Sequence, residues 1–207
     1  MESIVLPVSC IVLGGALSFT HVGSGIDDKV RDVIRYRNHK TALDDHLQYL
    51  PTVAIFGLSL TGLKARHDYV DRTIVTATGY LLMTSVVQIG KRTFRVMRPD
   101  GSKANSFPSG HTATAFLGAE FVREEYGSWW GVGAYTLAGL IALTRIYNDR
   151  HWASDVITGA GVGILSARAS YWLLPYTRKL IRGEKAQLTA LPFYTGKSGG
   201  VSLALRF

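Results

Sequence analysis

The sequence contains almost no cysteine: among 207 residues only Cys10 carries a thiol, and it lies in an apolar run. A single thiol excludes an internal disulfide framework and any metal site built from several cysteines. Acidic residues are also scarce, since 15 Asp and Glu stand against 23 Lys and Arg, which gives a formal net charge of +8. This charge favours an anionic partner: a nucleic acid, an anionic membrane or a phosphorylated substrate.

Two further absences narrow that choice. The sequence has no RNP motif, zinc finger or basic zipper, and much of its charge sits between apolar runs, so a membrane or a phosphate is favoured over nucleic acid. A basic segment is also missing at the start, where the chain opens with Met1-Glu2. The first apolar run is therefore a poor match to a secretory signal peptide, and we interpret it as a first membrane or core helix.

The hydropathy pattern predicts six helical runs. Several approach the ~20 residues that cross a bilayer, and Trp and Tyr residues lie near their ends, as in an interfacial aromatic belt. We therefore expect an all-α bundle of about six helices that spans a membrane; the alternative is an all-α globule with buried helices. The runs are 3–19, 47–63, 71–88 with a continuation toward Arg95, 109–125, 129–147 and 152–174.

Other segments have different patterns. Residues 27–37 place apolar side chains on one face, which predicts an amphipathic helix that either lies on a membrane surface or packs on the bundle. Residues 201–207 alternate apolar and polar side chains, which predicts a strand and, with the preceding apolar stretch, a small β-hairpin. We expect one helical domain over 1–185 and a tail over 186–207, with an ordered flap and a disordered end both open.

Two charged residues, Glu120 and Arg168, lie inside predicted apolar runs. Charges in such positions usually face the interior of a bundle and pair. Whether these two contact each other is left open by the sequence.

The polar residues of greatest interest fall on one face if each run crosses the bundle. Lys91 and Arg98 are seven residues apart, or two helical turns, so both can point the same way. The stretch Pro108-Ser109-Gly110-His111 opens the fourth run. Pro suits a first turn, and Ser109 and Gly110 can leave backbone N–H groups free, so the helix start predicts an anion site.

The third cluster contains Arg145, His151 and Asp155. On a helix, residues four apart are neighbours, so the carboxylate of Asp155 can hold one ring nitrogen of His151 protonated while the other acts as a nucleophile. His111 can then protonate a leaving oxygen. Lys, Arg and backbone N–H donors suit the charge that spreads over a phosphoryl group in transit. Chemistry alone does not decide which histidine attacks.

The pattern Lys-x6-Arg-Pro, then Pro-Ser-Gly-His, then Arg-x5-His-x3-Asp resembles the three-part signature of the type 2 phosphatidic acid phosphatase superfamily. That group includes membrane lipid phosphatases, soluble acid phosphatases and vanadium haloperoxidases. The one departure is Thr144, where the family usually has Ser; a hydroxyl is kept, so we expect only slightly altered positioning.

The resemblance implies a role for each matched residue. His151 would be the nucleophile that forms a phosphohistidine, His111 the general acid and Asp155 the residue that orients His151. The phosphate would be held by Lys91, Arg98, Ser109, Gly110 and Arg145. No metal or cofactor is implied, and orthovanadate is expected to inhibit.

We therefore expect a metal-independent lipid phosphate or diphosphate phosphatase in the bacterial inner membrane, with its site facing the periplasm as the family implies. Phosphatidic acid, phosphatidylglycerol phosphate, undecaprenyl diphosphate and lipid A phosphate would all fit. The first alternative is a soluble or peripheral acid phosphatase of the same superfamily. A vanadium haloperoxidase is disfavoured by the small size, and a non-enzymatic membrane-binding protein would not need His111, His151 and Asp155 in register.

Overall fold

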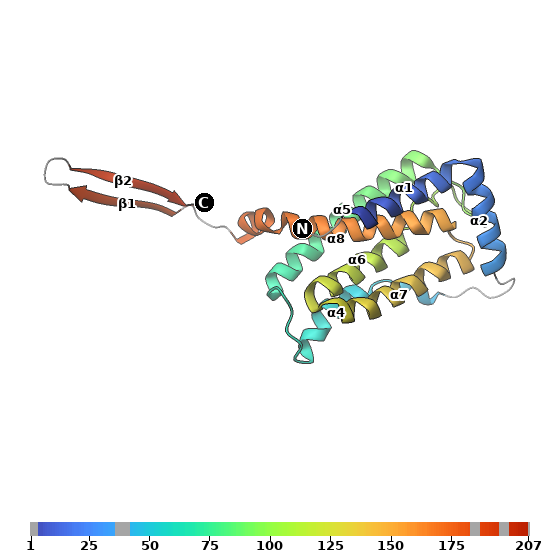
Figure 1. The fold of residues 1–207 in the computed structure, drawn as a ribbon, viewed down its shortest axis with the longest axis horizontal. Helices are drawn as coiled ribbons and strands as arrows, with labels where there is room; N and C mark the ends of the chain where they lie inside the picture. The colour runs from blue at the N-terminus through green and yellow to red at the C-terminus, as the bar shows by residue number, and fades with distance from the viewer. Residues whose placement is uncertain (1–3, 36–41, 183–186, 195–198, 207) are drawn as a thin grey trace.

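In the computed structural model the chain forms a bundle of helices followed by two strands (Figure 1). Residues 4–35, 42–182, 187–194 and 199–206 are described. The helices are α1 (Val5–Phe19), α2 (His21–Ile34), α3 (Leu43–Leu47), α4 (Leu50–Leu60), α5 (Tyr69–Phe94), α6 (Gly110–Tyr126), α7 (Ser128–Tyr147) and α8 (Ala153–Arg182), and the strands are β1 (Gln187–Tyr194) and β2 (Gly199–Arg206).

The all-α bundle predicted from the sequence is confirmed. The six predicted runs correspond to α1, α4, α5, α6, α7 and α8, with shifted ends. Helix α5 ends at Phe94 because the next residue, Arg95, adopts a left-handed conformation with φ of 48°. Helix α8 continues through Pro175 to Arg182, well beyond the predicted end. The short helix α3 was not predicted, and its five residues are too few to show a helical period.

The predicted amphipathic helix is also present as α2, which begins earlier than expected. Thr20 caps it, since its hydroxyl oxygen accepts a hydrogen bond from the backbone N–H of Gly23 at 3.1 Å. A bend of 96° separates α1 from α2, and Figure 1 shows α2 turned across one end of the bundle. Val30 and Ile34 pack against a buried cluster formed by α7 and α8. Of the two alternatives, packing on the bundle is therefore observed.

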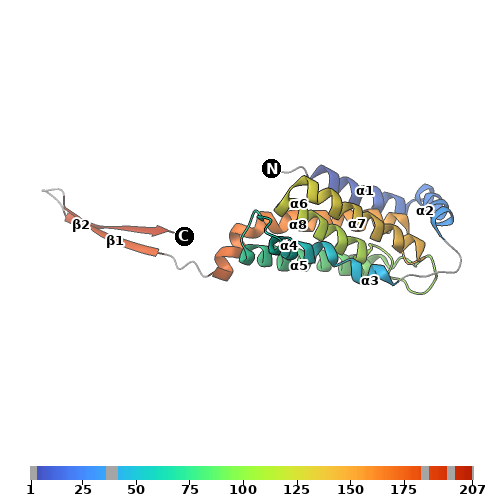
Figure 2. The same ribbon diagram turned by 90° about the horizontal axis from the view of Figure 1, so that it is seen from below.

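The core is built around α6, which packs against α4, α5, α7 and α8. Figures 1 and 2 both show α6 running alongside α8. Leu117 and Phe121 of α6 are fully buried and meet Ile55 of α4 and Val75 of α5 in the main apolar cluster. Burying each of these side chains contributes roughly 1.5–3 kcal/mol, so the apolar face of α6 holds the bundle together.

Helices α6 and α8 approach each other closely at two glycines. A Cβ atom added to Gly159 would lie 2.5 Å from the carbonyl oxygen of Ser109, and one on Gly163 would collide with the carbonyl oxygen of Ala113. Small residues at such contacts let two helix backbones meet directly. The starts of α6 and α8, which carry the polar motifs, are therefore held together by backbone contact.

Fewer of the described helices are long and apolar enough to cross a membrane than the sequence predicted. Within those residues α5 is the helix that is long and apolar enough to cross a bilayer alone, and α1 with α2 passes the same test as a bent pair. Large apolar side chains that are more than half exposed lie on α1, α5 and α7, for example Val12, Leu81, Ile89 and Leu140. Exposed apolar surface of this kind is typical of a face that meets lipid or a partner.

The two charged residues inside the apolar runs do meet. Arg168 donates from Nε to Oε1 of Glu120 at 2.5 Å, and Arg123 donates to both oxygens of the same carboxylate at 2.8 Å. Tyr135 donates its hydroxyl to Glu120 as well. Glu120 is fully buried, and a carboxylate can be buried when it is paired in this way. The expectation of an inward-facing, paired charge is confirmed.

The predicted β-hairpin is confirmed too. Strands β1 and β2 pair in antiparallel register, from Gln187 opposite Arg206 to Tyr194 opposite Gly199. Figure 1 draws the hairpin beyond the C-terminal end of α8.

Candidate active site

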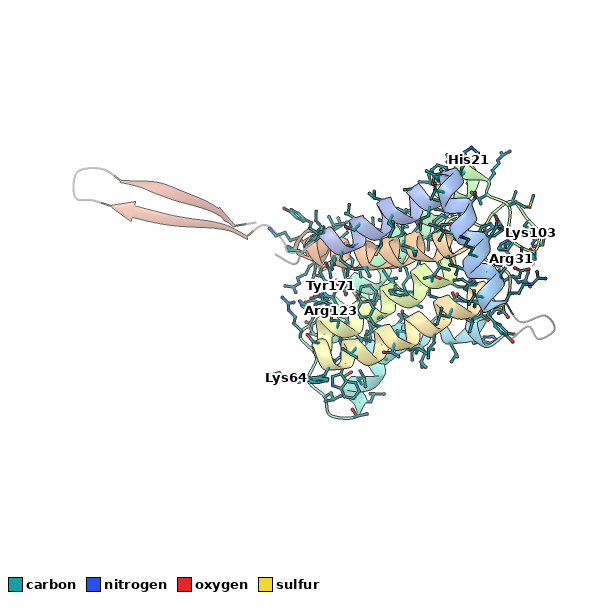
Figure 3. The ribbon with its side chains drawn as sticks, turned by 45° about the vertical axis from the view of Figure 1, so that its right-hand side comes forward. His21, Arg31, Lys64, Lys103, Arg123 and Tyr171 are labelled. Atoms are coloured by element: carbon teal, nitrogen blue, oxygen red, sulfur yellow. The ribbon has the colours of Figure 1, made fainter. Side chains whose placement is uncertain are left out.

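The polar motifs gather at the end of the bundle where α5 and α7 finish and α6 and α8 begin. Figure 2 shows α3 at this end, and Figure 3 labels Arg31 and Lys103 here, with Arg123 and Tyr171 toward the opposite end. The loop between α5 and α6 folds back on itself: Ser106 donates its backbone N–H to the carbonyl of Val96 at 2.9 Å. This loop places Arg98 and Ser106 beside the starts of α6 and α8.

His151 and Asp155 are neighbours, as their spacing predicted, and both are deeply buried. The Nδ1 atom of His151 lies 3.5 Å from Oδ2 of Asp155. The same oxygen accepts the backbone N–H of Trp152 at 2.9 Å and the hydroxyl of Ser106. The Ser106 hydroxyl oxygen also lies 3.4 Å from Nδ1 of His151. Ser106 therefore links the pair, a contact that the motif spacing did not reveal.

Burial sets the protonation state of His151. The ring is 2% exposed, and this desolvation lowers its pKa to about 4; Asp155 acts in the opposite direction, while Lys91 and Arg145 lower the pKa further. At neutral pH the imidazole is therefore uncharged. Because Asp155 and Ser106 face Nδ1, the second ring nitrogen, Nε2, keeps a lone pair for attack on an electrophile.

A cation-lined pocket of about 410 Å³ lies nearby; His151 and Asp155 are not in its lining, but His151 follows the lining residue Arg150 and donates its backbone N–H to the carbonyl of Arg145 at 3.3 Å. Its walls include three guanidinium groups, those of Arg98, Arg145 and Arg150, together with His111 and Asp45. Burial lowers the pKa of Arg98, and the positive charges of Arg150 and Arg145 nearby lower it further. Such a pocket has the charge and the donor geometry to hold a phosphate group.

Two buried guanidinium nitrogens at this pocket are available to bind an anion. The Nε atoms of Arg98 and Arg145 are buried, and neither has a hydrogen-bond acceptor in the described part of the chain. A buried donor without a partner is costly, and an anion bound in the pocket would supply an acceptor for these two atoms. Lys91 differs, because its ammonium already donates to the carbonyl of Asn105 at 2.6 Å.

The start of α6 differs from the prediction in two respects. The helix begins at Gly110 with Ser109 as the N-cap residue, so Pro108 lies before the helix and not in its first turn. The backbone N–H of Ser109 is not free, because it donates to the carbonyl of Asp155 at 3.0 Å. The side chain of Ser109 is fully buried and bonds to the hydroxyl of Thr112. Gly110 is half-buried at the first helical position.

Thr144, at the family's usual serine position, makes a bond inside its own helix. Its hydroxyl donates to the carbonyl of Ile141 at 2.7 Å. The next residue, Arg145, is buried and faces the pocket. The hydroxyl at position 144 therefore has a local backbone partner in α7.

Sequence reasoning missed the two carboxylates that α3 contributes. Asp44 is buried and pairs with the Nη1 atom of Arg145. Asp45 accepts a hydrogen bond from Nε2 of His111 at 2.8 Å and lies 3.3 Å from Nη1 of Arg145. A local motif search cannot find these contacts, because α3 lies far from both partners in the chain.

The loop before His151 is held by α2. Arg31 donates from Nε and Nη2 to the two oxygens of Asp149, at 2.6 and 2.8 Å, and from Nη2 to the carbonyl of Pro99 at 3.0 Å. Asp149 adopts a positive φ of 61° at this turn. Asp149 therefore fixes this turn, and the next residue, Arg150, lines the pocket.

Among the described residues no group of three or more His, Cys, Asp or Glu side chains is arranged to hold a metal ion.

Known proteins resemble this chain in family, sequence and fold. A family model described as the PAP2 superfamily matches residues 73–179, a range that contains all of the predicted site residues. The lipid A 1-phosphatase of Porphyromonas gingivalis is 42% identical over 186 residues, which are 86% of this chain and 42% of that protein. The lipid A 1-phosphatase of Helicobacter pylori is 28% identical over 128 residues, 59% of this chain and 66% of that protein.

Among solved structures, the crystal structure of Aquifex aeolicus LpxE matches with a TM-score of 0.54 and 25% sequence identity, over 70% of this chain and 93% of that chain. The chain spans less than half of the Porphyromonas relative and about two thirds of the Helicobacter relative. The family model covers just over half of the chain, and with it the whole set of polar motifs. The chain belongs to the PAP2 superfamily.

Proposed function

We propose that this protein is a phosphatase that removes a phosphate group from a lipid through a covalent phosphohistidine, with no metal ion. The observation that carries the proposal is a neutral, buried His151, backed by Asp155 and in contact with Arg145, which lines a pocket together with Arg98 and Arg150. A nucleophile next to a cluster of guanidinium groups is what phosphoryl transfer requires.

In the first step, Nε2 of His151 attacks phosphorus and the bond between phosphorus and the lipid oxygen breaks. The leaving oxygen takes a proton from His111, and the guanidinium groups hold the charge that spreads over the three remaining phosphoryl oxygens. In the second step, water gives a proton to His111 and attacks phosphorus, which releases phosphate and restores His151. Asp155 stabilises the positive charge on the ring of His151 while the phosphohistidine exists.

The surroundings of the site favour a lipid as substrate. Helix α5, which is apolar and long enough to cross a bilayer, ends beside the pocket, and exposed apolar side chains cover parts of α1, α5 and α7. The site therefore lies where a headgroup phosphate would be when the acyl chains rest in the membrane. The names of the two relatives point to the 1-phosphate of lipid A as the substrate.

The test is a phosphate-release screen on the detergent-purified protein. Lipid A, phosphatidic acid, phosphatidylglycerol phosphate and undecaprenyl diphosphate are compared, with His151→Ala as the inactive reference. His21→Ala is the matched control, since His21 is exposed at the start of α2. We expect release from lipid A that His151→Ala abolishes and His21→Ala leaves intact. Release from none of these lipids would refute the proposal, and activity without detergent would favour a soluble or peripheral acid phosphatase.

We propose further that the protein lies in a bacterial inner membrane with the site toward the periplasm. Lys103 and Lys64 are exposed at opposite ends of the bundle in Figure 3, so each reports one side. In a Cys10→Ser background, Lys103→Cys should react with a membrane-impermeant maleimide on spheroplasts, and Lys64→Cys only after lysis. The reverse pattern would place the site in the cytoplasm.

A further inference from the structure

Besides Asp44, helix α3 places a second acidic residue, Asp45, against His111, the proposed proton donor. Asp44 is 1% exposed, and its carboxylate accepts hydrogen bonds from Arg145 and Asn148. Its contacts therefore hold α3 against α7 and its C-terminal end. Asp45 is different, because about half of its side chain is exposed at the pocket and its Oδ1 atom accepts from His111. The proposed reaction assigns a task to His111 and none to Asp45.

The charges around His111 make this contact important. Arg145 lies against the same Asp45 oxygen, Arg98 and Arg150 line the same pocket, and Asp44 is committed to Arg145. Burial, and after it the charge of Arg145, lower the pKa of His111 below its ordinary value, whereas the hydrogen bond and the charge of Asp45 act to raise it. A general acid must carry its proton when the substrate arrives. In the described residues, Asp45 is the acidic side chain with a hydrogen bond to the ring.

Asp45 itself stays ionised. Partial burial acts to raise its pKa, but the hydrogen bond from His111 and the charges of His111 and Arg145 outweigh burial, so the pKa is lowered. A carboxylate and an imidazolium at 2.8 Å form a charge-assisted hydrogen bond.

We propose, on the basis of the phosphatase function above, that Asp45 is a positioning residue for proton donation. Its carboxylate favours the protonated form of His111 against burial and Arg145 and fixes the ring through Nε2, so the proton that reaches the leaving oxygen comes from the other nitrogen, Nδ1.

The proton balance of the step follows from this assignment. As the bond from His151 to phosphorus forms, the bond from phosphorus to the lipid oxygen breaks and its electron pair stays on that oxygen. The proton on Nδ1 of His111 moves to the oxygen, and the imidazolium becomes a neutral imidazole that still donates from Nε2 to Asp45. Asp45 remains a carboxylate throughout, and in the second step the neutral ring can accept a proton from water.

The test compares the pH dependence of kcat/KM for wild type, Asp45→Asn and Asp32→Asn. Asp32 is exposed on α2 and provides a matched control for the loss of one carboxylate. The basic limb of kcat/KM reports loss of the proton from the general acid in the free enzyme. We expect Asp45→Asn to move this limb to lower pH by about 1 unit, because one partly exposed charge-assisted hydrogen bond is lost. Asp32→Asn should leave it in place.

A second measurement separates positioning from folding. An alkyl phosphate needs a proton on its leaving oxygen, whereas p-nitrophenyl phosphate releases a stable phenolate. Asp45→Asn should therefore lower kcat for the alkyl phosphate by about tenfold more than for the aryl phosphate at pH above the shifted limb. A purely structural defect would lower both equally.

Each outcome decides a different point. A shifted basic limb with a selective loss on the alkyl phosphate supports the role of Asp45. An equal loss at every pH, or an increase in kcat/KM at every pH, overturns it; the increase would mean that Asp45 only competes with phosphate for Arg145. If wild type itself releases no phosphate from any substrate, the phosphatase proposal fails, and this is seen before any variant is compared.

Discussion

Asp155→Asn is the substitution for which the structure gives the sharpest expectation. The Oδ2 atom of Asp155 receives the Ser106 hydroxyl and the backbone N–H of Trp152 and lies 3.5 Å from Nδ1 of His151. Asparagine has the same size and can keep both of these donors through its carbonyl oxygen. It loses the negative charge, and its NH₂ group can turn His151 to the wrong tautomer.

The magnitude follows from burial. Asp155 is fully buried and His151 is 2% exposed. The stabilisation of about 0.3–1 kcal/mol that is typical of an exposed ion pair therefore does not apply to them. The orienting carboxylate of a catalytic triad supplies about 10⁴ in kcat. Here the contact is longer and shared with Ser106, so we expect a loss of about 10²–10⁴, or roughly 3–5 kcal/mol in the barrier.

The assay is steady-state phosphate release with a melting curve on the same preparation. Phosphate affinity should change little, because Arg98, Arg145 and Arg150 are untouched. Ser106→Ala is the informative companion: it removes one donor and keeps the charge, so its loss in kcat should be smaller than that of Asp155→Asn. A near-normal kcat for a folded Asp155→Asn protein would refute the orienting role.

Four further results are expected from the same site. His151→Ala should lower kcat by on the order of 10³ or more in a protein that still melts cooperatively, because no other group replaces the nucleophile; wild-type-like release would disprove the assignment. Activity should persist in excess EDTA, since guanidinium groups match the phosphate charge; loss that Mg²⁺ or Zn²⁺ restores would contradict a metal-free step. Orthovanadate should inhibit competitively, because it mimics the five-coordinate phosphoryl state, and indifference at millimolar vanadate would count against the pocket. Because the pKa of His151 is lowered to about 4, kcat/KM should stay flat as pH falls through 6 and decline only near that value; a decline centred near the usual histidine pKa would show that the nucleophile is exposed.

The sequence predicts the part of the site that is local in the chain. His151 and Asp155 are four residues apart and do meet, although His151 lies just before α8, which begins at Ala153, so the turn that enters the helix brings them together. The two-turn spacing of Lys91 and Arg98 suggested that both can point the same way, but α5 ends between them at Phe94, and the loop brings Arg98 to the pocket.

The remaining contacts could not be predicted, because they join segments that are distant in the chain. Asp44 and Arg145 are 101 residues apart, and Arg31 and Asp149 are 118 apart. Neither pair has a helical or strand period to reveal it. Ser109 shows the converse: its N–H looks free from local rules and is used by the carbonyl of Asp155, which only the packing of α6 on α8 brings near.

The glycine contact between α6 and α8 has a consequence for how such a site can diversify. His111 and His151 sit at the starts of two helices whose separation is set by main-chain atoms meeting at Gly159 and Gly163. We therefore expect changes in the size of core side chains elsewhere to leave the spacing between the proposed donor and the proposed nucleophile unchanged. On the proposed function, selection for a new lipid would act on α3 and on the loop after α5, which border the pocket, while the two histidines keep their spacing.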